Sequence, residues 1–382
     1  MRKPNSLLVV SLASLLACAA CSGAGGTLPE GNGPIDGDGQ LDGTPESGGS
    51  RSGGGMASAP EAAGASAGAP APPGGGGGGG GGGNGQVAAG ILTAGAWDDN
   101  ANFDRFLRYR AGVIASGQHT AGLLPIDEAA HRAAHAAPRG GAKQTLDVSL
   151  MIDTTGSMGD ELRYLQTEFS ALATRISQTY PGAQQRWSLV LYKDTTDEYI
   201  VRWFNFRSDT AEFRAHLAAQ SASGGGDFPE APDSALAVAN RLTWRTGADT
   251  ARLLFWVADA PHHDAKAEAM AAAIKDARDK GIHVYPVASS GVDELTELSM
   301  RSAAQLTGGR YLFLTDDSGV GGAHKEASVP CYFVTKLDKA ILRMVDIEMT
   351  GAYREPAAAD VVRTGGNPTD GACQLEGPPQ AY

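Results

Sequence analysis

The sequence predicts an α/β fold in which a mostly parallel sheet of six strands is covered by helices on both faces. Two apolar runs, 148–152 and 253–260, have the length and content of strands that are buried on both sides. Helical patterns alternate with runs of this kind, which is typical of a parallel sheet with crossover helices. About 200 residues are enough for a single core of this class.

The other elements of this domain follow in order along the chain. The helix after the first strand has an apolar stripe at spacings of three and four: Leu162, Leu165, Phe169, Leu172 and Ile176. Runs 186–194 and 199–206 are predicted strands, and the alternation in the second suits an exposed or edge strand. Further strands are expected at 282–289 and 310–314, and further helices at 209–220, 232–242, 265–280 and 337–345.

The first apolar run ends on a carboxylate that begins a group of oxygen-bearing side chains. Asp153, Thr155 and Ser157 occupy alternate positions, and Gly156 lets the backbone turn tightly between the last two. These residues lie between the carboxyl end of a strand and a helix, where open α/β sheets bind ligands. Carboxylate and hydroxyl oxygens suit a hard divalent cation such as Mg²⁺. The alternative is a helix cap, for which Asp, Thr and Ser are also common.

The sequence Asp153-Thr154-Thr155-Gly156-Ser157 resembles the DxTxS form of the metal-ion-dependent adhesion site of von Willebrand factor A domains. Two later segments agree in order and spacing, GGGDFPE at 224–230 and LLFWVADA at 253–260. The resemblance covers roughly 144–350 and implies a Rossmann-like sheet whose third strand is antiparallel at one edge. It also implies a site for Mg²⁺, Mn²⁺ or Ca²⁺ that is formed by Asp153, Thr155, Ser157, Asp227 and Asp259.

The second and third segments depart from the integrin-like pattern. Asp227 stands where integrin-like domains have Thr, and DAPHH at 259–263 replaces the usual TDG, which is similar to the domains found beside alpha-kinases. A direct Asp227 ligand would add negative charge and weaken the attraction for an acidic partner. A metal that mainly holds the loops together is therefore an alternative. Glu230 is interpreted as the start of the next helix, where the dipole favours an acid.

The resemblance implies a module that binds a protein or surface ligand, whose acidic side chain completes the coordination of the metal. No enzymatic activity is expected. The alternatives are a metal-dependent hydrolase that uses Asp259, His262 and His263, although no nucleophile motif accompanies them, and a scaffold that the metal only stabilises. The formal charge of −12 argues against a nucleic-acid partner.

Residues 1–21 are expected to form a lipoprotein signal peptide, with Arg2 and Lys3 before a short apolar stretch. Leu15-Leu16-Ala17-Cys18 resembles a bacterial lipobox in which Cys18 is acylated, and Cys21 is a second candidate. An ordinary secretory peptide is the alternative. The prediction is therefore an exported protein of the bacterial cell envelope, lipid-anchored in the outer membrane.

Residues 22–89 are rich in Gly, Ala, Pro and Ser, and they are predicted to be a disordered tether that separates the domain from the membrane. Residues 90–143 are expected to be an extension that packs on the domain, with a helix that Asn102 caps. His131 and His135 have the four-residue spacing of a metal site, but are interpreted as part of a solvated helix face.

The C-terminal tail is expected at 351–382. Cys331 and Cys373 are the two cysteines that remain after export. In an oxidising compartment they are best interpreted as one disulfide that ties this tail to the domain.

Overall fold

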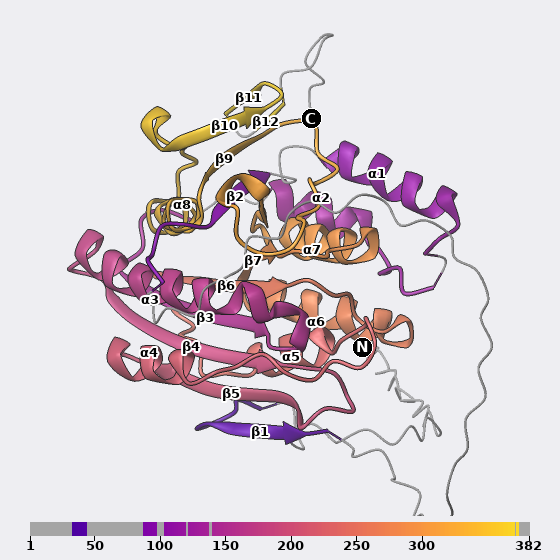
Figure 1. The fold of residues 1–382 in the computed structure, drawn as a ribbon. Helices are drawn as coiled ribbons and strands as arrows, with labels where there is room; N and C mark the ends of the chain where they lie inside the picture. The colour runs from indigo at the N-terminus through magenta and orange to yellow at the C-terminus, as the bar shows by residue number, and fades with distance from the viewer. Residues whose placement is uncertain are drawn as a thin grey trace, which may run out of the picture.

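The computed structural model of the protein describes residues 33–43, 87–97, 103–119, 121–136, 140–370 and 372–373. These residues contain one ten-stranded sheet in the order β1-β5-β4-β3-β6-β7-β8-β2-β9-β10 (Figure 1). The strands are β1 (Gly39–Asp42), β2 (Thr93–Trp97), β3 (Thr145–Asp153), β4 (Gln184–Tyr192), β5 (Tyr199–Arg207), β6 (Thr250–Ala258), β7 (His283–Ala288), β8 (Tyr311–Leu314), β9 (Tyr332–Lys336) and β10 (Val361–Gly365). The helices are α1 (Phe103–Ser116), α2 (Glu128–Ala136), α3 (Leu162–Thr179), α4 (Thr210–Ala218), α5 (Pro232–Ala239), α6 (Ala267–Asp279), α7 (Glu294–Thr307) and α8 (Leu337–Thr350).

The six central strands have the predicted arrangement. β3 pairs in parallel with β4 and β6, and β6, β7 and β8 continue the parallel part, whereas β5 is antiparallel to β4. In β3 every residue after the first is buried, as expected for a strand that is covered on both faces. The α/β class and the mostly parallel centre of the sheet are therefore confirmed.

The sheet is wider than predicted, because antiparallel strands are added at both sides. β1 covers the outer side of β5, so β5 is not the edge. The expectation of a disordered tether is wrong for residues 33–43, where the two apolar side chains of a polar, Gly-rich segment, Ile35 and Leu41, are buried. At the other side, β2 lies between β8 and β9, so the extension joins the sheet and does not merely pack on it.

Helices cover both faces of the sheet. The core of one face includes side chains of α3, α4 and α8, and that of the other face includes side chains of α5, α6 and α7. α7 was not predicted, and almost all of it is buried because α1 and α2 pack on its outer side. Arg301 of α7 makes a buried ion pair with Glu297 at 3.1 Å and lies over the Tyr109 ring of α1.

The prediction that α2 presents a solvated histidine face is wrong for His131. This side chain is 3% exposed and stacks on Phe103, with ring centroids 5.6 Å apart. Burial lowers its pKa. His131 is therefore part of the contact between the two helices of the extension.

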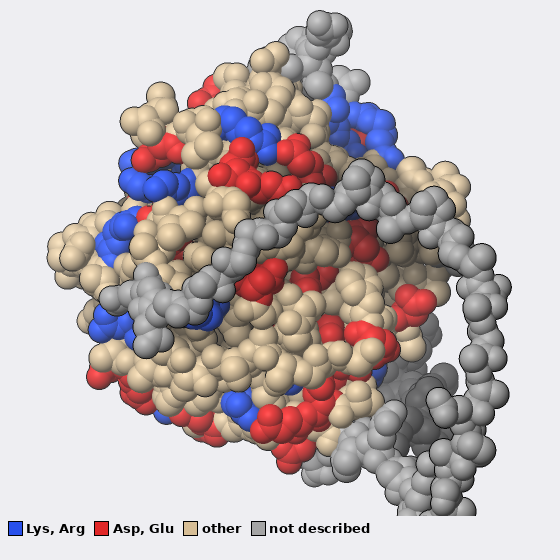
Figure 2. Space-filling view, in the orientation of Figure 1, with Lys and Arg blue, Asp and Glu red and all other residues tan. Residues whose placement is uncertain are grey.

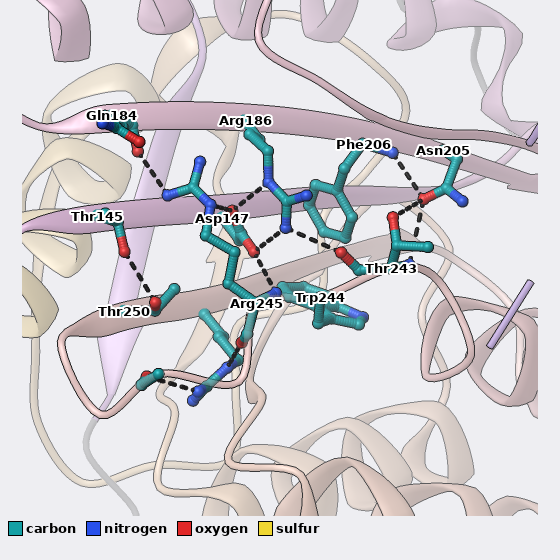
Figure 3. A network of polar contacts seen from close by, with 12 residues as sticks. Thr145, Asp147, Gln184, Arg186, Asn205, Phe206, Thr243, Trp244, Arg245 and Thr250 are labelled. Atoms are coloured by element: carbon teal, nitrogen blue, oxygen red, sulfur yellow. Dashed lines mark hydrogen bonds and ion pairs between the residues drawn. The ribbon is translucent and has the colours of Figure 1, made fainter. Parts of the chain in front are cut away.

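A buried ion-pair network closes the amino end of β3 (Figure 3). The Asp147 carboxylate accepts hydrogen bonds from Arg186 Nε at 3.0 Å and Nη2 at 2.6 Å, and from the backbone N–H of Arg245 at 2.8 Å. The Arg245 Nε lies 3.5 Å from the same carboxylate. Asp147 is fully buried, but both of its oxygens have cationic partners.

The last described residues pack against β9. β10 pairs with β9, and a disulfide joins Cys331, just before β9, to Cys373, with the Cα atoms 5.7 Å apart. Cys18, Cys21 and Asn102 lie outside the described residues. Among the described helices, none has the length and apolarity needed to cross a bilayer.

Candidate metal site

The first loop of the candidate site follows β3 and brings together the three oxygen-bearing residues that the sequence indicated. Asp153 is fully buried, and its Oδ1 accepts hydrogen bonds from the Thr155 N–H at 2.9 Å and the Thr155 hydroxyl at 2.7 Å. The Thr155 and Ser157 hydroxyls lie 3.2 Å apart. The Asp153 Oδ2 is buried without a hydrogen-bond partner. Ser157 is exposed, so the loop reaches the surface.

The second loop, 223–230, is fastened to the first by backbone hydrogen bonds. The Ser223 N–H donates to the Thr154 carbonyl at 3.0 Å, and the Gly156 N–H donates to the Gly224 carbonyl at 3.0 Å. Gly225 has a φ of 75°, and a Cβ at this position would lie 3.0 Å from the Thr155 Cβ and 3.1 Å from Glu230 Oε1. The glycine therefore permits both the left-handed turn and the close approach of the two loops.

Asp227 and Glu230 lie differently from what the sequence indicated. Asp227 is exposed, and its side chain forms no hydrogen bond or ion pair with the described part of the chain. Glu230 is 2% exposed, and its carboxylate lies beside Gly225 and Thr155 with Oε2 unpartnered. The interpretation of Glu230 as a mere helix start is therefore wrong. Its backbone N–H donates to the Pro261 carbonyl at 2.8 Å, which fixes it next to the third loop.

The third loop follows β6 and supplies Asp259. β3 and β6 are adjacent and parallel, so their carboxyl ends meet at the same edge of the sheet. Asp259 is 3% exposed, and its Oδ1 is buried without a hydrogen-bond partner. The Ser157 side chain lowers the pKa of Asp259, which indicates that the first loop lies close to this carboxylate.

Burial and neighbouring acidic side chains raise the pKa values of the three carboxylates. Burial, and then the nearby Asp259, raise the pKa of Asp153 to about 7. Burial raises the pKa of Asp259 to about 6, and burial followed by the charge of Asp153 raises the pKa of Glu230 to about 10. Low polarity and like charges both disfavour the ionised forms. Within the described residues, none of the three forms an ion pair with Lys, Arg or His.

Lys193 is a buried cation near the site that sequence reasoning missed. It directly follows β4, is 2% exposed, and donates hydrogen bonds to the carbonyl and the hydroxyl of Ser223. It lowers the pKa of Asp153 only as a minor influence. Its main contact is with the second loop, so it positions that loop and leaves the carboxylates unbalanced.

The residues present fit a hard divalent cation. Three buried carboxylate oxygens without partners belong to Asp153, Asp259 and Glu230, and the hydroxyls of Thr155 and Ser157 lie beside them. All of these are oxygen donors, which suit Mg²⁺, Mn²⁺ or Ca²⁺ better than softer metals. In the described part of the chain, no three His, Cys, Asp or Glu side chains lie together so that they could hold a metal ion by themselves. Hydroxyl groups and water must therefore complete the coordination shell.

The two histidines of the third loop make other contacts. His262 is 1% exposed, with Nε2 2.7 Å from the Gly122 carbonyl oxygen of the extension and Nδ1 3.4 Å from the Ser299 hydroxyl. His263 Nε2 lies 2.5 Å from Asp194 Oδ1, in the loop after β4. Both side chains therefore hold neighbouring segments in place.

Comparisons with known proteins agree with this architecture. The family profile of the von Willebrand factor A domain matches residues 147–320. A protein described as ariadne-like with a RING finger, from Acanthamoeba polyphaga mimivirus, is 32% identical over 118 residues, which are 31% of this chain and 11% of that protein. The chain thus spans about a tenth of that relative.

Among solved structures, the chain is similar to the crystal structure of the conserved hypothetical protein BatB from Bacteroides thetaiotaomicron. The TM-score is 0.34 at 18% identity, over 44% of this chain and 89% of that one. The family match begins at Asp147 in β3 and spans the three loops of the candidate site. The match over residues 147–320 therefore supports a von Willebrand factor A domain in that part of the chain.

Proposed function

We propose that the domain binds a protein or surface ligand through a divalent cation that the three loops hold. Asp153, Thr155 and Ser157 from the first loop, Glu230 from the second and Asp259 from the third would hold the ion. The observation that carries this proposal is that Asp153, Glu230 and Asp259, one from each loop, all keep a buried carboxylate oxygen without a partner in the described part of the chain. Such oxygens are costly in a protein interior unless a cation balances them.

The residues of the site would have different roles in holding the ion and in giving a ligand access to it. Thr155 donates to one oxygen of Asp153, so the unpartnered Oδ2 would be available to hold the ion. Gly156 and Ser157 are exposed, so an oxygen of a ligand can reach the site from solvent. The bound cation would supply a coordination position for a carboxylate of the partner. Glu230 adds a third acidic group, so this site should hold an acidic ligand less strongly than a site with two carboxylates.

Asp227 lies at the surface of the second loop, beside the exposed Phe228. We assign Asp227 to the rim that a partner would contact. Phe228 is 47% exposed, and an exposed aromatic side chain at the rim of a polar site suits a protein partner.

We propose further that the protein is exported and anchored to the cell envelope through Cys18, with Cys21 as the alternative. The disulfide between Cys331 and Cys373 supports an oxidising compartment. The formal charge of −12 and the wide distribution of acidic side chains on the face in Figure 2 give no support to a nucleic-acid partner.

No specific observation favours the hydrolase alternative, because His262 and His263 both contact other segments. A cation that only stabilises the loops remains the competing explanation. The two are separated by measuring ligand capture and stability on the same protein. The test uses residues 22–382, which include every described residue, and peptides that carry one Asp or its Asn counterpart.

The proposal predicts that Mg²⁺ or Mn²⁺ promotes binding of Asp-bearing peptides, that a chelator abolishes it, and that the Asn peptides bind at least tenfold more weakly. Equal binding of the Asp and Asn peptides would favour the scaffold explanation. The Asp153→Ala variant is the control, and it should lose peptide capture while keeping its circular dichroism spectrum.

A further inference from the structure

The segment 33–43 lies far from the rest of the N-terminal region. β1 and β2 are consecutive in the chain, but seven strand positions separate them across the sheet (Figure 1). At about 4.8 Å per strand this separation is about 34 Å. The 50 residues between Asp42 and Thr93 can extend up to about 165 Å. The length of the link therefore allows the segment to reach β5 of its own domain or of another one.

Two apolar side chains fasten the segment to the domain. Ile35 and Leu41 are each 8% exposed and belong to the core cluster that also contains Val190, Ile200 and Trp203. The segment is otherwise polar and rich in Gly. Only these two side chains are buried against the domain, and the rest of the segment has too few apolar residues to form a core by itself.

Polar contacts fix the register of the segment on β5. The Asp38 carboxylate accepts a hydrogen bond from the Asn205 N–H at 2.7 Å and forms an ion pair with Arg207 at 3.2 Å. The Asn205 Nδ2 donates to the Ile35 carbonyl at 2.6 Å, and Arg202 Nε donates to Gln40 Oε1 at 2.7 Å. The outer side of β5 therefore recognises an acidic residue at one position of an extended segment.

Close packing adds a second requirement. A Cβ at Gly39 would lie 2.4 Å from the Trp203 ring, and Gly37 has a φ of 84°. A side chain at 39 would clash, and one at 37 would strain the backbone. The required pattern is thus Ile-x-Gly-Asp-Gly-x-Leu, which every copy of this chain carries at 35–41.

We propose that the outer edge of β5 is a strand-binding site that segment 33–43 fills reversibly, and that the same segment of a second copy fills it in turn and joins two copies. β1 has only four paired residues, and an uncovered strand edge is a template for pairing with another chain. For a link of this length and composition, the chain's own segment has an effective concentration on the order of millimolar or below. Copies that are crowded together reach comparable concentrations, so exchange between them becomes possible. This inference is independent of the metal site.

The test uses residues 22–382 with a protease recognition site placed in the glycine run 74–83. After cleavage and dialysis, a fluorescent peptide of residues 33–43 is titrated by anisotropy, and circular dichroism monitors the fold. We expect saturable binding to the cleaved chain. Binding should be at least tenfold weaker for the uncleaved chain, because its own segment competes, and at least tenfold weaker for a Leu41→Asp peptide.

Three outcomes would overturn the strand-binding site. These are the absence of saturable binding to a folded cleaved chain, equal binding of the two peptides, and irreversible unfolding after the segment is released. A second measurement tests the joining of copies. Uncleaved chains that carry donor or acceptor dyes are mixed at millimolar concentration, and energy transfer that excess peptide 33–43 abolishes is expected. Its absence would overturn exchange between copies.

Discussion

Asp147 and Asp153 lie near opposite ends of the same strand, β3, and both are fully buried, but their surroundings are opposite. At the amino end, Arg186 and Arg245 supply the Asp147 carboxylate with hydrogen bonds and positive charge (Figure 3). At the carboxyl end, Asp153 faces the carboxylates of Asp259 and Glu230 and keeps one oxygen without a partner. The buried carboxylate at the amino end is matched, because cations balance its charge. The buried carboxylate at the carboxyl end is unmatched, because no cation among the described residues does so.

The difference shows how burial alone fails to identify a functional acid. A buried carboxylate with two cationic partners is a framework residue, which stabilises the fold, because its removal leaves buried cations without an acidic partner. A buried carboxylate among other carboxylates weakens the empty domain, and such unmatched groups are concentrated at ligand sites.

The largest expected effect is at the matched end. Replacing Asp147 by Ala leaves Arg186 and Arg245 without their acidic partner, and we expect the free energy of unfolding to fall by about 3 kcal/mol. Urea denaturation measures this change. Lys275→Ala, which removes an exposed ion pair with Asp279, is the control and should change stability by less than about 1 kcal/mol. A loss at Asp147 as small as that of the control would contradict the framework role.

A substitution at the carboxyl end of β3 is expected to change the free energy of unfolding in the opposite direction. In metal-free protein at pH 8, Asp153→Asn removes a buried charge that burial and Asp259 disfavour, so stability should rise by about 2 kcal/mol. The same variant should gain nothing from added Mg²⁺. Thermal unfolding with and without chelator measures both effects. A large destabilisation of the metal-free protein would show that Asp153 is a framework residue like Asp147.

The second loop carries a buried acidic residue, Glu230, and an exposed one, Asp227, whose effects on cation affinity can be compared. Glu230→Gln removes a carboxyl group that must ionise to bind the cation, and we expect affinity for the cation to fall about tenfold, or about 1.4 kcal/mol. Asp227→Asn should change this affinity less than twofold, because Asp227 is exposed to solvent. Titration calorimetry of the two variants compares them directly. The reverse order of effects would restore Asp227 as the ligand.

The pH dependence of stability follows from the same buried carboxylates. The folded-state pKa of Asp153, about 7, and that of Asp259, about 6, lie above their ordinary value of 3.8. The stability that these groups contribute is therefore present at low pH and is lost as pH rises from about 4 to about 7. Metal-free melting temperatures should show this decline relative to Asp153→Asn. Saturating Mg²⁺ should remove the difference, and an identical pH profile for both proteins without metal would contradict the pKa assignment.

Much of the fold was predictable because its signals are local. A strand that is buried on both faces is a continuous apolar run, and the runs that become β3 and β6 each end on a carboxylate. Since both strands are parallel and adjacent, Asp153 and Asp259 had to meet at one edge. The first and third loops of the candidate site follow from the sequence for this reason.

The missed features depend on contacts between distant segments. Glu230 points into the site because its backbone bonds to Pro261, and no local pattern indicates that bond. Helix α7 has no solvated face because α1 and α2 cover it, so the usual amphipathic signal is absent. Segment 33–43 has only Ile35 and Leu41 to bury, and its stability depends on the shape of β5, which composition does not show.

The metal site at the carboxyl end of β3 is tested by isothermal titration of metal-stripped residues 22–382 with Mg²⁺, Mn²⁺ and Ca²⁺. The Asp153→Ala variant is titrated in the same way, and the Asp227→Asn variant is the matched control. We expect saturable binding of at least one of these ions to the parent protein and to Asp227→Asn, and no binding to Asp153→Ala. Binding that survives in Asp153→Ala, or that is absent from the folded parent protein for all three ions, would contradict a metal site at the carboxyl end of β3.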